Sequence, residues 1–398
     1  MNRAILVASG LIVGLADSGP ALAADDNRIN IQAVVTETYD SNVAASDAAA
    51  AAERGITPSD WIFDPSIAVD LLLPISRQAV FLKGSVGYDF YADNHILDNG
   101  AIDLQGGLKG QISTCRGTIT DDFKYAQTEL QYLPIAITKN TERDESIGLD
   151  GSCGGQVGIV PTLSVSEDWT DNSASELITS DYQALNLMTG LAYRAPRFGE
   201  LSTYFSYDQT DFPSRDLLVG PATIQDGYKE YGIGVKYDRR LGARIEGTVS
   251  VSYSDLRPDD ATVQGFEGVT FDADVTMRFS RLLQGKLTLE RGVDPTIWPG
   301  VTYELENSYG LEADYTPGRK LKFSAGVSGG SNQYHGADLT PGVDISGESF
   351  WSVRGSVSYQ VNRRFGLELD ATHMARDANV PEFSYPDNQV ALSLKAGI

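Results

Sequence analysis

The stretch YGIGVKYDRRLGARIEGTVSVSYSD, residues 231–255, sets a pattern that most of the chain repeats. Residues 231–237 alternate apolar side chains at odd positions with glycine or charged side chains at even positions, the period of a β-strand. After a turn at residues 239–242, the alternation resumes and continues to Tyr253. A tilted strand that crosses a lipid bilayer needs ~9–11 residues and an uncharged outer side. The stretch therefore predicts two transmembrane β-strands.

The same alternation predicts about 18 strands. No segment after Ala23 is apolar for long enough to form a transmembrane helix, so a closed barrel must satisfy the backbone hydrogen bonds in lipid. We expect an all-β, antiparallel, up-and-down transmembrane barrel with short periplasmic turns and longer external loops, the latter including 40–60 and 211–226. A propeller or β-helix is the alternative, but neither exposes an uncharged face on nearly every strand. The expected strands lie at 29–39, 67–73, 80–90, 102–112, 119–125, around 147–149, 157–165, 185–193, 201–207, 231–237, 243–253, 271–279, 287–289, 301–315, 321–327, 351–359, 365–371 and 390–398.

The N-terminus has the pattern of a secretory signal peptide. A basic start at Arg3 precedes an apolar run at residues 4–16, and Ala21-Leu22-Ala23 is an A-x-A cleavage site. We expect a signal peptide at residues 1–23 and one mature barrel domain at residues 24–398. A membrane anchor is the alternative, but the run is shorter than the ~20 residues of a spanning helix.

The formal net charge of −23 argues against a nucleic-acid partner, which needs a basic face. The two cysteines, Cys115 and Cys153, share the local pattern Ser/Thr-Cys-x-Gly at expected turns on one end of the barrel. In an exported chain such a pair suggests a disulfide, with two free thiols as the alternative.

The inward face of the second half carries charges of both signs, and we expect these side chains to line a wet lumen. Alternatively, they pair across strands and brace the barrel, and both roles can coexist because 16–18 strands leave an aqueous channel. Ten are acidic and six are basic, which favours cations in an open pore. The residues are Arg244, Glu246, Asp272, Asp274, Arg278, Lys286, Glu290, Glu304, Glu306, Glu312, Asp314, Lys322, Arg354, Glu368, Asp370 and Lys395.

The sequence gives no support for an enzyme. No serine stands in a G-x-S-x-G elbow, no usual metal-ligand spacing occurs, and we expect no metal and no cofactor. His373 with Asp370 and Asp377 offers one alternative, the acidic and histidine cluster of a barrel protease. A lone histidine near loop carboxylates is more often simply solvated.

Three segments carry a resemblance to a known family. They are residues 37–43 (ETYDSNV), residues 64–67 (DPSI) and residues 84–91 (GSVGYDFY). In these the chain resembles the putative β-barrel porin 2 family, over nearly all of its mature length. The resemblance implies an outer-membrane barrel of Gram-negative bacteria, and several members are associated with export of surface polysaccharides. The last residue, Ile398, departs from the usual aromatic ending of such barrels.

We therefore expect a channel of the cell outer membrane that exports a surface polysaccharide. A general diffusion porin for small solutes, or a non-conducting barrel whose loops bind or brace the envelope, are the alternatives. The expected partners are outer-membrane lipid, the barrel-assembly machinery and periplasmic components of polysaccharide export.

Overall fold

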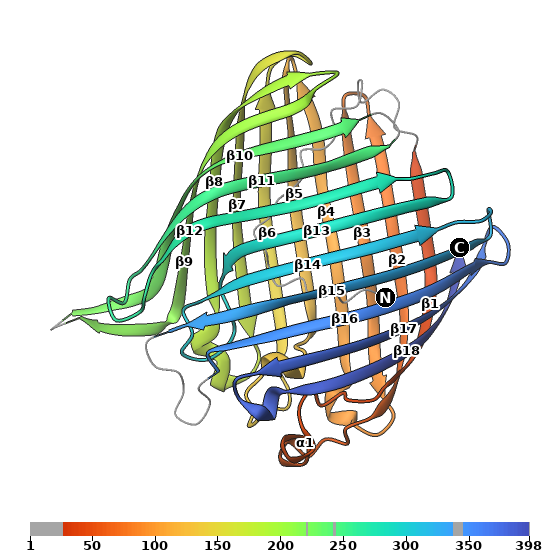
Figure 1. Ribbon diagram of the computed structural model, residues 1–398, viewed down its shortest axis with the longest axis vertical. Helices are drawn as coiled ribbons and strands as arrows, with labels where there is room; N and C mark the ends of the chain where they lie inside the picture. The colour runs from red at the N-terminus through yellow and green to blue at the C-terminus, as the bar shows by residue number, and fades with distance from the viewer. Residues whose placement is uncertain (1–26, 220–221, 242–243, 337–344, 398) are drawn as a thin grey trace.

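A computed structural model describes residues 27–219, 222–241, 244–336 and 345–397 of the chain. These residues form a closed antiparallel barrel of 18 strands, in which each strand pairs with its neighbours in sequence and β1 pairs with β18 (Figure 1). The predicted fold class and strand number are confirmed. The predicted signal peptide, residues 1–23, lies outside the described residues, as does Ile398.

The strands are much longer than those of an ordinary soluble sheet, and most run for 13–16 residues. They are β1 (Arg28–Asp40), β2 (Asp60–Ile75), β3 (Gln78–Tyr91), β4 (Asn99–Ile112), β5 (Cys115–Gln127), β6 (Thr141–Cys153), β7 (Gly158–Asn172), β8 (Tyr182–Ala195), β9 (Gly199–Val219), β10 (Ala222–Leu241), β11 (Ile245–Pro258), β12 (Phe266–Arg278), β13 (Leu283–Asp294), β14 (Tyr303–Tyr315), β15 (Leu321–His335), β16 (Gly347–Gln360), β17 (Phe365–Ala378) and β18 (Tyr385–Gly397).

The period of two divides each strand between the two faces of the barrel wall. Val249 on β11 is 40% exposed on the outside, while the adjacent Ser250 is 6% exposed and faces the interior. Large apolar side chains are exposed in the same way on nearly every strand, because lipid rather than water surrounds this face. Within the described residues, no helix is long and apolar enough to cross a membrane.

Short turns and longer loops lie at opposite ends of the barrel. The turn between β2 and β3 has only two residues, and Ser76 adopts a positive φ of 60° there. The longer connections contain α1 (Ala48–Arg54) and the 3₁₀ turns η2 (His95–Leu97), η3 (Leu130–Tyr132), η4 (Ser175–Ser180) and η5 (Pro381–Phe383). In Figure 1 they gather at the lower end with α1, which lies in the loop expected at residues 40–60.

Two sequence predictions about this end are wrong. Residues 211–226 are not a loop, because β9 and β10 continue through them as a long hairpin whose register shifts between Gln225 and Asp226. The start of the predicted strand 301–315 does not face lipid either. Val301, Tyr303 and Leu305 are at most 5% exposed. Tyr303 packs against a cluster formed with Tyr228, Leu256 and Val263.

Candidate functional site: the barrel interior

At the outer end of the barrel the loops pack against one another. Two apolar clusters combine side chains from connections that are far apart in the sequence. One centres on the loop between β5 and β6, residues 128–140, and the other on Trp298 from the β13–β14 connection. We call these clusters together the loop core. Their buried members are Ala44, Ala50, Ala51, Ile56, Leu97, Leu130, Leu133, Ile135, Ile137, Leu177, Trp298, Val301, Tyr334, Ile345 and Phe383.

Helix α1 is fixed to this core through its last residue. Arg54 is buried and donates hydrogen bonds to the carbonyl oxygens of Leu130 and Leu133, at 2.9 and 2.7 Å. Burial lowers the pKa of Arg54 to about 10, so the side chain stays protonated at neutral pH. Gly55 ends the helix in the left-handed conformation, φ 70°, and its amide donates to the helix carbonyls. The first external loop is thereby joined to the loop at residues 128–140.

The loop at residues 128–140 is also joined to the barrel wall on β16–β18. Arg376 on β17 forms a buried ion pair with Glu348 on β16 and donates to the carbonyl oxygen of Gln131. The phenol of Tyr385 on β18 donates to Oε1 of Gln131 at 2.6 Å. Because β5 and β6 lie several strands away from β16–β18, this loop extends across the opening. We call the group of Gln131, Glu348, Arg376 and Tyr385 the loop latch.

Below the loops, most of the charges predicted to face the lumen are paired between neighbouring strands. Arg278 pairs with Glu246 at 3.7 Å, Lys286 with Asp274 at 2.7 Å, Lys322 with Asp314 at 3.0 Å and Lys395 with Glu368 at 2.6 Å. Arg354 pairs with Asp370. These contacts match the bracing interpretation of the inward charges.

The other predicted residues are five acids and one arginine, and among the described residues they form no ion pair of this kind. Asp272, Glu290, Glu304 and Glu306 lie on the same inner face, and Glu312 is exposed on β14. Arg244 lies exposed in the turn before β11.

An acidic cavity of about 220 Å³ lies along the inner wall from β7 to β13. Besides its acidic side chains, the cavity is lined by the hydroxyl groups of Ser164, Ser166, Ser206, Thr210, Ser250, Ser252, Ser254 and Thr270. Of the lining residues only Arg291 is basic, and its guanidinium donates to the carbonyl of Val269 and to Asn307. The acids that line the cavity are Asp168, Asp208, Glu230, Asp272, Glu290 and Asp294.

Sequence reasoning named only two of these six acids. Asp168 and Glu230 precede the aromatic residues Trp169 and Tyr231, and Asp208 follows Tyr207, so the period of two, continued to the strand ends, would have placed all three inside. Asp294 and Arg376 lie after the last residues of the expected strands 287–289 and 365–371, and Glu348 lies before the expected strand 351–359, where the alternation gives way to loop sequence.

The histidine cluster considered for a protease is not assembled. His373 contacts Asn388 Oδ1 at 2.9 Å and packs beside Trp351, both on the outer face, whereas Asp370 points inward to Arg354. Positions 370 and 373 of the strand are an odd number of residues apart, so their side chains fall on opposite faces of the wall. In the described part of the chain, no group of three or more His, Cys, Asp or Glu residues could hold a metal ion.

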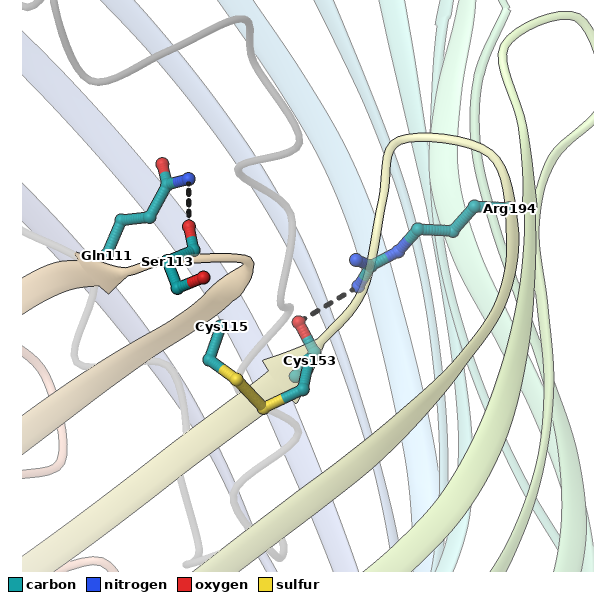
Figure 2. Close-up of a disulfide and its surroundings, with 6 residues drawn as sticks. Gln111, Ser113, Cys115, Cys153 and Arg194 are labelled. Atoms are coloured by element: carbon teal, nitrogen blue, oxygen red, sulfur yellow. Dashed lines mark hydrogen bonds between the residues drawn. A yellow bond between two sulfur atoms is a disulfide. The ribbon is translucent and has the colours of Figure 1, made fainter.

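A disulfide joins Cys115 and Cys153 at the end opposite the loops (Figure 2). The two residues are directly opposite each other at the ends of β5 and β6, with Cα atoms 3.9 Å apart. The bridge closes the hairpin that carries the loop at residues 128–140. On the inner side of the same end, Arg194 donates to the hydroxyl of Ser152 at 3.2 Å.

A closed barrel with a lipid-facing apolar exterior and a charged interior defines a porin-like β-barrel channel of the outer membrane. The family model described as "Putative beta-barrel porin 2" matches residues 226–397, from β10 to β18, and this confirms the resemblance over that part of the chain. The match supports a channel rather than an enzyme.

Solved structures with a similar fold come from Pseudomonas aeruginosa. OccK2 (OpdF), crystallised in complex with glucuronate, has a TM-score of 0.48 and 12% identity, covering 94% of this chain and 98% of that one. OpdL has a TM-score of 0.47 and 13% identity, covering 94% and 99%. OccK3 (OpdO) has a TM-score of 0.45 and 11% identity, covering 93% and 96%. A comparison with curated proteins finds none that matches.

Proposed function

We propose that this protein is a diffusion channel for small hydrophilic solutes in the outer membrane, and that it favours cations over anions. The proposal rests on the acidic cavity in the barrel interior. Six carboxyl side chains line it, and the guanidinium of its one basic residue is bound elsewhere. Rings of one charge in a pore set the sign of the ion that passes, and the surrounding field raises the local concentration of that ion.

The loop core supports small solutes rather than a polymer as the cargo. It places buried apolar side chains across the external opening, and the loop latch holds them against the wall. A polysaccharide also needs aromatic surfaces on which sugar rings can stack. Tyr182, Tyr204 and Tyr228 line the cavity and offer such surfaces, so the preference for small solutes rests on the loop core. Polysaccharide export, the first expectation from the resemblance, is therefore the weaker proposal.

Reversal potentials in planar bilayers under a KCl gradient test the proposed selectivity. We expect a potential of the cation-selective sign that decreases at high salt, where the screening length shortens to ~3 Å at 1 M. The variant Glu290→Gln should reduce it, because Glu290 lines the cavity. Glu246→Gln is the matched control, since Glu246 forms an ion pair with Arg278 near the short turns, outside the cavity lining. A potential of the anion-selective sign would refute the proposal.

A further inference from the structure

We propose that the inner wall holds a binding subsite for a primary ammonium group, where β13 and β14 meet beneath the loop core. The subsite consists of Asp294, Glu304 and Glu306. This subsite would select small amines among the solutes of the channel. The inference rests on the proposed function, because the amine reaches the subsite through the lumen.

The register brings the three carboxyl groups together. Asp294 on β13 is directly opposite Glu304 on β14, and Glu306 follows on the same face two residues further along. Side chains directly opposite across antiparallel strands have Cβ atoms about 5 Å apart, and residues i and i+2 are about 7 Å apart. All three are nearly inaccessible to solvent, at 3%, 3% and 5% exposure.

Two of these groups retain an oxygen without a hydrogen-bond partner. Within the described residues, Asp294 Oδ2 and Glu306 Oε2 are buried and accept no hydrogen bond. Leaving buried polar atoms unpaired is costly, and a buried charge needs a counter-charge as well. The nearby cation, Arg376, is already bound to Glu348 and to the carbonyl of Gln131. Asp294 Oδ2 and Glu306 Oε2 therefore lack hydrogen-bond donors, and the guanidinium of Arg376 is bound elsewhere.

A primary ammonium group supplies both hydrogen-bond donors and positive charge. It is a compact cation with three N–H donors and no acceptor, which matches a set of carboxylate acceptors on two adjacent strands. Access comes from the acidic cavity, because Asp294 lines it together with Glu290 and Glu230. An amine that enters the cavity is thus in contact with the edge of the subsite.

Isothermal titration of the full barrel, purified in detergent at neutral pH, tests this assignment with n-butylammonium as the probe. Tetramethylammonium is the comparison, because it has the same charge but no N–H donor, and 1-butanol is the neutral comparison. We expect saturable binding of one n-butylammonium at least about tenfold tighter than tetramethylammonium, the difference that hydrogen bonds to buried charged groups typically make. Asp294→Asn and Glu306→Gln should each weaken it at least about tenfold.

Glu312→Gln is the matched control variant, because Glu312 lies on the same strand and is exposed well away from the subsite. Equal affinities for both cations, or an equal loss in Glu312→Gln, would indicate a diffuse acidic field and overturn the subsite. Potassium conductance of the same preparation separates the two proposals. A protein that conducts potassium without binding n-butylammonium would refute the subsite alone, and one that binds it without conducting would support the subsite and refute the channel. Heat-modifiability on unboiled gels shows that each variant is folded.

Discussion

Replacing Arg376 by methionine should weaken the attachment of the loop at residues 128–140 to the wall, because within the loop latch only the bond from Tyr385 to Gln131 then remains. The side chains of Arg376 and Glu348 are only 2% and 3% exposed, so the substitution leaves Glu348 buried without its counter-charge. Removing one partner of a buried ion pair costs ~3–5 kcal/mol. The hydrogen bond from the charged guanidinium to the Gln131 carbonyl, a kind that contributes about 1.5–3 kcal/mol, is lost as well. We therefore expect a lower urea midpoint and a higher single-channel conductance than in the wild type.

The double variant Arg376→Met, Glu348→Met separates the two effects. An apolar pair of similar volume often restores the stability of a buried ion pair, because no charge is then left uncompensated. The lost bond to Gln131 is not restored, so the conductance should stay high while the urea midpoint recovers. Arg354→Met is the matched control, since Arg354 on β16 pairs with Asp370 on β17 of the same inner wall. If Arg376→Met and the double variant both conduct like the wild type, the loop does not restrict the opening and the reasoning fails.

Two further predictions concern the wall itself. Val249→Arg places a charge on the lipid face and should reduce the stability of the inserted barrel by ~2–4 kcal/mol, whereas Ser250→Arg, inside the acidic cavity, should fold and reduce the preference for cations. The two variants are compared on gels by the shift in mobility that boiling causes in a folded barrel. An equal shift in Val249→Arg and Ser250→Arg would contradict the assignment of faces. The disulfide closes a segment of 38 residues, so Cys115→Ser should lower the free energy of unfolding by up to about 4 kcal/mol. Urea unfolding with and without reductant checks this, and an unchanged wild-type midpoint in reductant would count against a stabilising bridge.

The sequence by itself determined the wall of this barrel. The period of two is a property of the strand backbone, so apolar and polar positions can be assigned strand by strand without knowledge of any distant residue. Val249 and Ser250 illustrate this, as do the ion pairs of Lys286 with Asp274 and of Lys395 with Glu368, whose members were all assigned to the lumen. Eighteen such strands can satisfy all their backbone hydrogen bonds in lipid only when the sheet closes into a barrel.

Only the tertiary structure decided how the loops close the outer end. The bond from Arg376 to Gln131 joins residues 245 positions apart, and a local pattern contains no information about such a pair. The same limit explains the error at residues 211–226, where turn-like residues continue as strand because β9 and β10 pair with each other. It also explains Tyr303, an apparent lipid-facing residue that other segments bury. Side-chain alternation follows from local backbone geometry, whereas burial at the strand ends depends on which distant segments cover them.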